Sequence, residues 1–256
     1  MTKKIGLLIL ALLLIMESSA RAVEEDSRFK LTYNGIKKSV VTATISPAFY
    51  IPAGLALITF YEDIGRNASE ETRENHPLWG DQERASDASD NLRTLSSVAM
   101  ISSSLLFVPK GLKYVFSNLA FDVAASFGAT TTRALIRDGN RRSRPNGNEA
   151  SFPSGHATAA GARVALANYN IFQSDLNSTT KYLLAGFNWS IAYMTGYSRV
   201  ESHNHYPEDV LAGIAIGYWV TNVLKMTFTN TRRDLAVSII PYGDRSEVGL
   251  QTVVSF

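Results

Sequence analysis

Apolar side chains recur every three or four residues in five successive stretches between residues 94 and 226, with Gly and Pro near the ends of the stretches. This is the period of a helix with one buried face, because an α-helix turns once every 3.6 residues. The chain is therefore predicted to be mainly α, a helical bundle. The expected helices are Thr94–Val108, Leu112–Ile136, His156–Phe172, Lys181–Tyr197 and Glu208–Met226.

The end of the chain follows a different period. Leu235–Pro241 and Glu247–Phe256 read as strands, and the turn-rich segment between them contains Gly243 and Asp244. An outer-membrane barrel strand also ends on an aromatic residue with such alternation, but a single hairpin does not make a barrel. We expect a small C-terminal β-hairpin packed against the helices.

The first 22 residues have the layout of a secretory signal peptide. Lys3 and Lys4 precede an apolar run of 12 residues, Ile5–Met16, and Ala20-Arg21-Ala22 has the small side chains of a cleavage site. An uncleaved membrane helix is the alternative, although a span needs about 20 apolar residues. We therefore expect export to the periplasm or the cell envelope.

The N-terminal region has two contrasting parts. Ser39–Tyr61 carries no charge for 23 residues and could span a bilayer, although Pro47 and Pro52 weaken that interpretation. Glu62–Arg93 contains nine acidic residues and four Arg, and we expect a long loop with short helical pieces. The expected segments are a signal peptide at 1–22, a helical and loop region at 23–93, a helical core at 94–234 and the hairpin at 235–256.

The composition excludes several kinds of site. The chain has no cysteine, so disulfides, thiolate zinc sites, iron–sulfur clusters and cysteine nucleophiles are ruled out. Beyond residue 22, the charges balance at 22 basic and 22 acidic side chains, which argues against nucleic-acid binding through bulk charge. The mean hydropathy of −0.03 favours a water-soluble or membrane-docked domain over a polytopic membrane protein.

A run of guanidinium groups marks the end of the second predicted core helix. Four Arg lie within eight residues: Arg137, Arg141, Arg142 and Arg144. Guanidinium forks bind phosphate oxygens bidentately and stay charged at any physiological pH. Taken alone, the run is more typical of a solvated loop or of Arg side chains against membrane headgroups than of a phosphate site. Arg141 and Arg142 fit either recruitment of an anionic substrate or plain solvation.

The second cluster, Pro153-Ser154-Gly155-His156, directly precedes an Ala-rich helix. Ser154 suits the N-cap, and Gly155 lets the backbone approach a ligand closely. Unpaired N–H groups and the positive end of the helix dipole favour an anion there, with His156 beside it. A purely structural N-cap is the alternative. A serine-hydrolase elbow is rejected because Phe152 stands where G-x-S-x-G requires glycine.

The third cluster runs from Ser198 to Asp209. His205 and Asp209 are four residues apart, near enough for the carboxylate to fix the imidazole tautomer and strengthen His205 as a nucleophile. Arg199 adds another phosphate-binding fork. A metal site of His203, His205 and Asp209 is the alternative, but no further converging ligand cluster supports it.

In this order, the three clusters resemble the signature of the type-2 phosphatidic acid phosphatase superfamily, which includes bacterial acid phosphatases, glucose-6-phosphatase and vanadium haloperoxidases. Its pattern is K-x6-R-P, then P-S-G-H, then S-R-x5-H-x3-D, and the last two parts match at every fixed position. The first part keeps Arg144-Pro145 but has Arg137 in place of Lys, which preserves the charge on a bulkier group. The resemblance implies a bundle of the acid phosphatase/haloperoxidase type.

The resemblance also implies a metal-independent phosphatase with a phosphohistidine intermediate and no cofactor. His205 would attack phosphorus, Asp209 would orient it, and His156 would protonate the leaving oxygen. The implied substrate is a phosphorylated small molecule or a lipid headgroup, with membrane association possible and no nucleic-acid partner. The groups implied to hold the phosphoryl oxygens are Arg137, Arg144, Ser154, Gly155 and Arg199.

Two functions from other classes stay open at this point. A vanadate-dependent haloperoxidase would use the same anion pocket for a bound cofactor, although family members of that kind are usually longer. A non-catalytic envelope binding or structural protein would keep the helical core, but a binder of phosphate would not need a nucleophile. Whether the substrate is soluble or a lipid is also open, because the mean hydropathy favours the first and Ser39–Tyr61 the second.

Overall fold

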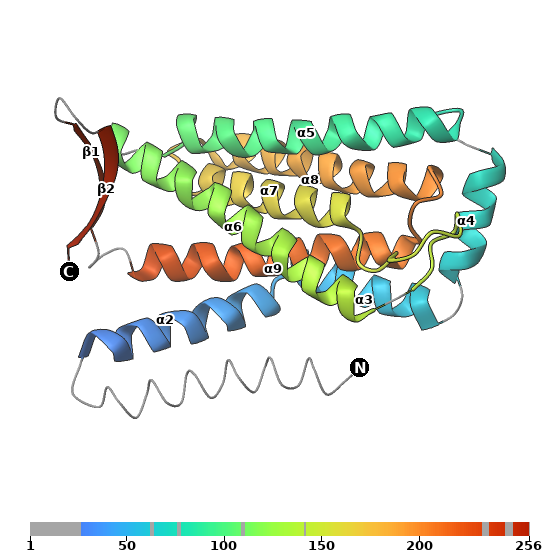
Figure 1. The fold of residues 1–256 in the computed structure, drawn as a ribbon, viewed down its shortest axis with the longest axis horizontal. Coiled ribbons are helices and arrows are strands. Elements are labelled where there is room, and N and C mark those ends of the chain that lie inside the picture. The colour runs from blue at the N-terminus through green and yellow to red at the C-terminus, as the bar shows by residue number, and fades with distance from the viewer. Residues whose placement is uncertain are drawn as a thin grey trace.

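A computed structural model of the chain describes residues 27–61, 64–75, 78–108, 111–140, 142–231, 236–243 and 248–255. Within these ranges the chain forms helices followed by a two-stranded hairpin. The long helices lie side by side in an elongated bundle, and α4 (Ile64–Asn75) crosses one end of it (Figure 1). The predicted signal peptide lies outside the described residues.

The predicted fold class is confirmed. Each of the five helices expected between residues 94 and 226 is present, and β1 (Ala236–Gly243) pairs with β2 (Val248–Ser255) in an antiparallel hairpin. The helices are α2 (Ser27–Thr44), α3 (Pro47–Tyr61), α4 (Ile64–Asn75), α5 (Gln82–Leu106), α6 (Leu112–Gly139), α7 (Gly155–Phe172), α8 (Ser178–Glu201) and α9 (Pro207–Thr231).

Helix occupies most of the polar stretch that the sequence predicts as a loop. The stretch contains α4 and the first half of α5, which begins at Gln82, well before its predicted start. Asp81 caps α5 by accepting a hydrogen bond from the Arg84 backbone N–H. Its buried side chains here are Ala85 and Ser89, which are too small and polar to produce an apolar period. The prediction of a loop is therefore wrong over these residues.

The uncharged segment Ser39–Tyr61 is divided between two helices. α2 ends at Thr44 and α3 begins at Pro47, where a proline needs no N–H partner, and the two axes are bent by 54°. Among the described helices, Pro207–Thr229 has the length and composition to cross a membrane, and 56% of an 18-residue stretch of it is buried in the bundle. The bent pair of α2 and α3 also qualifies when it is counted as one span.

α7 is the central helix of the bundle, and most of its side chains are buried. It packs most extensively against α9. At Gly217 the two backbones approach so closely that a Cβ would lie 2.3 Å from the Thr158 carbonyl oxygen. Near the start of α7, the Ser154 N–H donates to the Asp209 carbonyl oxygen at 2.9 Å. The first turns of α7 and α9 are therefore held together at one end of the bundle.

A buried ion pair between α9 and α6 lies toward the far ends of α7 and α9. Lys225 of α9 is 1% exposed, and its Nζ lies 2.5 Å from Oδ1 of the fully buried Asp122 on α6. The other oxygen of Asp122 accepts hydrogen bonds from Asn170 on α7 and Ser104 on α5. This network therefore joins four helices through charges that have no access to water.

Replacement of Lys225 by methionine is expected to lower the free energy of unfolding by about 3–5 kcal/mol, because it leaves the Asp122 carboxylate buried without its cation. Thermal unfolding followed by circular dichroism in detergent measures the loss. The double variant Lys225→Met, Asp122→Asn is expected to recover most of it, since the buried charge is gone. A single variant as stable as the wild type would contradict a structural role for the pair.

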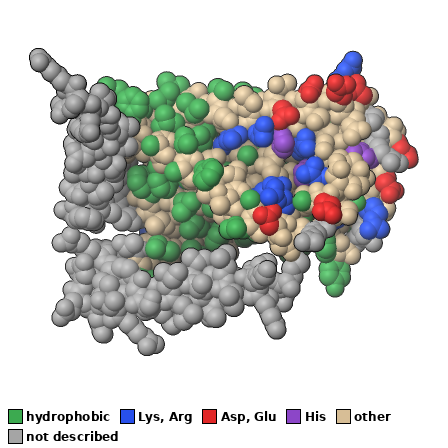
Figure 2. All heavy atoms as spheres, in the orientation of Figure 1, with side chains coloured by type: hydrophobic (Ala, Val, Ile, Leu, Met, Phe, Trp, Pro, Cys, Tyr) green, Lys and Arg blue, Asp and Glu red, His purple; other side chains and the backbone are tan. Residues whose placement is uncertain are grey.

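Large apolar side chains are exposed along the flanks of the bundle. They come from several helices, as Leu57 of α3, Phe127 of α6 and Leu183 of α8 illustrate, each at least 70% exposed. In Figure 2 the apolar side chains gather over one part of the visible face, whereas Arg, Lys, acidic and His side chains gather toward the end at which α4 lies. One end of the bundle is therefore polar and its flank is apolar.

Candidate active site

The polar end of the bundle brings the second and third sequence clusters together. His156 lies in the first turn of α7, and His205 lies in the turn between α8 and α9, just before Pro207 opens α9. The charge of Arg199, near the end of α8, acts on both imidazoles. The two histidines that the sequence predicts as catalytic therefore both lie within electrostatic reach of one guanidinium.

His205 is the more deeply buried of the two, with 2% of its surface exposed. Burial lowers the pKa of its ring well below the usual range, and the charges of Arg199 and Arg144 add to the effect. The ring is therefore neutral in this environment. A neutral imidazole has a free nitrogen lone pair, which is what a nucleophile requires.

The carboxylate of Asp209 lies beside His205 but is bonded elsewhere. Its Oδ2 is 3.9 Å from His205 Nδ1, which is longer than a hydrogen bond. The carboxylate instead accepts from Arg142 Nη1 at 2.9 Å, from the Tyr206 N–H at 2.9 Å and from the Ser151 hydroxyl. These bonds fix the position of Asp209. Its carboxylate lies close to His205, as expected, but does not form a hydrogen bond with the ring in this structure.

His156 has an acidic partner that the sequence analysis does not identify. Its Nε2 lies 2.9 Å from Oδ1 of Asp90 on α5, and Arg93 Nη2 lies 3.0 Å from the same oxygen. Burial and the charge of Arg199 lower the pKa of His156 to about 4, whereas the bond to Asp90 acts to raise it. The same bond lowers the pKa of Asp90, so this carboxylate is ionised.

Three of the predicted phosphate-binding side chains have buried polar atoms without a hydrogen-bond partner among the described residues: Arg144 Nε, Ser154 Oγ and Arg199 Nε. Ser154 occupies the N-cap position of α7 as predicted, but its side chain makes no capping bond. Arg199 is held on one side by the Ser89 hydroxyl at 3.2 Å. Buried donors are rarely left unpaired, so this set suits an anion with several oxygens.

The arginine of α6 that contacts the segment before α7 is Arg133, whereas the motif points to Arg137. The Arg137 side chain is 37% exposed, and its guanidinium pairs with the adjacent Asp138 at 2.7 Å. Arg133, one turn earlier on α6, donates from Nε to the Pro153 carbonyl oxygen at 2.9 Å. A Cβ at Gly155 would lie 3.2 Å from the Arg133 guanidinium carbon, so glycine admits this side chain beside the start of α7. Arg133 was not predicted.

Arg142, for which the sequence leaves substrate recruitment or plain solvation open, is held by two carboxylates, and its side chain is 23% exposed. Its Nη2 lies 2.5 Å from Glu208 Oε1, its Nη1 binds Asp209, and its guanidinium stacks 4.4 Å from the Tyr206 ring centre. Because both carboxylates are buried, their charges need this cation nearby. Arg142 therefore serves the structure of the site. Arg141 lies outside the described residues.

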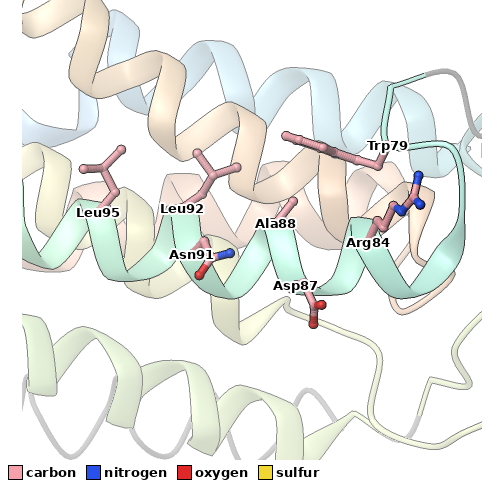
Figure 3. A pocket seen from close by; sticks show the side chains of 7 residues that line it. All are labelled: Trp79, Arg84, Asp87, Ala88, Asn91, Leu92 and Leu95. Atoms are coloured by element: carbon pink, nitrogen blue, oxygen red, sulfur yellow. The ribbon is translucent and has the colours of Figure 1, made fainter.

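The described residues contain no group of three or more His, Cys, Asp or Glu side chains that could hold a metal ion, so nothing among them supports the alternative metal site. An open groove of about 400 Å³ runs along α5. Trp79, Leu92 and Leu95 supply much of its apolar lining, and Arg84 and Asp87 lie at its border (Figure 3). The predicted site residues are not among those that line it.

Comparison with known proteins agrees with the motifs. A lipid A 1-phosphatase of Porphyromonas gingivalis is 35% identical to this chain over 92 residues. The match covers 32% of this chain and 19% of that protein, so the chain spans about a fifth of this relative's length. The crystal structure of a transmembrane PAP2-type phosphatidylglycerolphosphate phosphatase from Bacillus subtilis shares the fold, with a TM-score of 0.52 at 17% identity over 73% of this chain and 94% of that one.

The family assignment depends on a longer match. Residues 94–233 match the model of the PAP2 superfamily. They make up more than half of the chain and include all three sequence clusters. The chain therefore belongs to the PAP2 superfamily.

Proposed function

We propose that this protein is a membrane-associated phosphatase that removes the phosphate or pyrophosphate group of a lipid through a phosphohistidine. The observation that carries the proposal is the pair of imidazoles on which the charge of Arg199 acts, together with the unpaired buried donors of Arg144, Ser154 and Arg199. Side chains of this kind suit a phosphoryl group, whose charge is spread over three oxygens in the transition state.

The neutral ring of His205 begins the proposed reaction. Its Nδ1 is the nitrogen that lies toward Asp209, so Nε2 attacks phosphorus. The new N–P bond forms as the bond from phosphorus to the leaving oxygen breaks, and that oxygen takes a proton from His156. Arg144, Arg199 and Ser154 donate to the three equatorial oxygens while this occurs.

Hydrolysis then completes the cycle. His156, now neutral, accepts a proton from a water molecule that attacks phosphorus, and the N–P bond breaks to release inorganic phosphate and regenerate His205. The pKa of about 4 makes His156 protonated only in a minor fraction of the empty enzyme at neutral pH. Since the acid must carry its proton for the first step, kcat/KM is expected to fall as pH rises above this value.

A lipid substrate is proposed from the surface. The flanks expose large apolar side chains on α3, α5, α6 and α8, and the site lies at the polar end (Figure 2). Contact with a bilayer would remove these apolar surfaces from water and place the site near the headgroups. The names of the two relatives, both lipid phosphatases, agree with this choice. Export by the predicted signal peptide would place the activity in the periplasm or cell envelope.

The proposal predicts phosphate release by the purified protein in detergent micelles. The substrates to compare are dioctanoyl phosphatidic acid, phosphatidylglycerol phosphate, lipid A and p-nitrophenyl phosphate, with kcat/KM about tenfold or more higher for the preferred lipid because its remote parts also bind. EDTA should have no effect and vanadate should inhibit. A protein that releases phosphate from none of these four substrates, or that strictly needs added zinc, would refute the proposed activity.

A further inference from the structure

One face of the first half of α5 points polar groups at the site. Asp90 contacts His156, Ser86 and Ser89 contact the Arg199 guanidinium, and Arg93 contacts Asp90. These four residues follow the spacing i, i+3, i+4 and i+7, so they share one side of the helix. They precede residue 94, where the match to the family model begins.

The contact between Asp90 and His156 leaves only one ring nitrogen for chemistry. Asp90 is an ionised acceptor, so the nitrogen facing it, Nε2, carries a hydrogen and donates to Oδ1. Nδ1 is then the only ring nitrogen that can gain and lose a proton. Arg93 bonds the same Oδ1 and thereby limits the movement of the carboxylate.

We propose, on the basis of the function proposed above, that Asp90 is a positioning residue that fixes the tautomer of His156 and makes Nδ1 the proton donor to the leaving oxygen. In the first step the Nδ1–H proton passes to that oxygen as the P–O bond breaks, and Nε2–H stays on Asp90. In the second step Nδ1 takes a proton from the attacking water. Asp90 itself neither gains nor loses a proton.

The charges around His156 explain why such a partner is needed. Arg199 of α8 and Arg93 of α5 both disfavour the imidazolium, as does burial, and the Arg133 guanidinium of α6 lies beside the neighbouring Gly155. Asp90 is the acidic group that opposes them, through both its hydrogen bond and its charge. Without it, the pKa of His156 would fall further and fewer molecules would hold the acidic proton.

The test is whether the loss of rate caused by Asp90→Asn depends on the leaving group of the substrate. An alkoxide leaving group needs the proton of a general acid, whereas p-nitrophenolate leaves with little help. We expect kcat/KM, which reports the step that breaks the P–O bond, to fall about 10- to 100-fold for dioctanoyl phosphatidic acid and by less than about threefold for p-nitrophenyl phosphate. The pH above which kcat/KM declines is expected to move downward, and Asp90→Glu to restore part of the rate for the lipid.

Asp87→Asn is the matched control, because it changes an exposed aspartate one turn earlier on α5 that borders the groove. It is expected to leave both rates unchanged. Equal losses on both substrates in Asp90→Asn would indicate a structural role only and overturn the proposal, as would a gain in activity, which would mean that Asp90 holds His156 away from substrate. A wild-type protein inactive on both substrates would instead refute the proposed phosphatase function.

Discussion

The variant His205→Ala is expected to lose activity by a factor on the order of 10⁵ in kcat/KM, on lipid and aryl substrates alike. In the proposed reaction His205 supplies the electron pair that forms the bond to phosphorus, and no other described imidazole is placed to replace it. Phosphate release measures the loss. Acid quenching after mixing with ³²P-labelled substrate should trap a labelled protein in the wild type and none in the variant.

His203→Asn is the control for this experiment. His203 lies two residues earlier in the same buried turn and has a positive φ of 59°, a conformation that asparagine tolerates. We expect this variant to stay within about threefold of the wild type, since the proposed mechanism gives His203 no chemical role. Loss of the label in His203→Asn with retention in His205→Ala would identify His203 as the nucleophile and contradict the proposed role of His205.

The sequence predicts the fold best where a helix has one apolar face and one polar face. The five helices from residue 94 onward bury an apolar face, so their period is visible and each is confirmed. The first half of α5 buries Ala85 and Ser89 against its neighbours, and these side chains leave no apolar period. The hydrogen bond from the Arg84 N–H to Asp81 marks the start of that helix, but a single capping residue in a charged stretch is a weak signal.

The same limit applies to the site. The residues of the second and third clusters can be located because each lies a fixed number of positions from its motif partners. Asp90 contacts His156 across 66 positions of sequence, from a helix that the polar composition conceals. The difference between Arg133 and Arg137 depends on how α6 is rotated about its axis, which motif spacing does not specify. Long-range contacts and helix rotation are therefore what the sequence analysis could not supply.

Replacement of Arg199 by alanine is expected to lower kcat/KM by about 10²- to 10³-fold, by nearly the same factor for phosphatidic acid and p-nitrophenyl phosphate. Arg199 is 7% exposed, and its Nε has no partner among the described residues. The proposed ligand of this donor is a phosphoryl oxygen, which is chemically the same in both substrates. The loss should therefore not depend on the leaving group, in contrast to that of Asp90→Asn.

The pH profile supplies a second, independent readout for Arg199→Ala. Arg199 lowers the pKa of His156, so its removal should raise that pKa and move the decline in kcat/KM to higher pH. Arg84→Ala, which removes an exposed guanidinium on α5, is the control and should change neither the rate nor the profile. Two results would contradict a contact between Arg199 and the phosphoryl oxygens. One is a loss of kcat/KM in Arg199→Ala that is confined to phosphatidic acid, the substrate with the poor leaving group. The other is a decline of kcat/KM that moves to lower pH, and either would show that Arg199 acts on His156 or on folding instead.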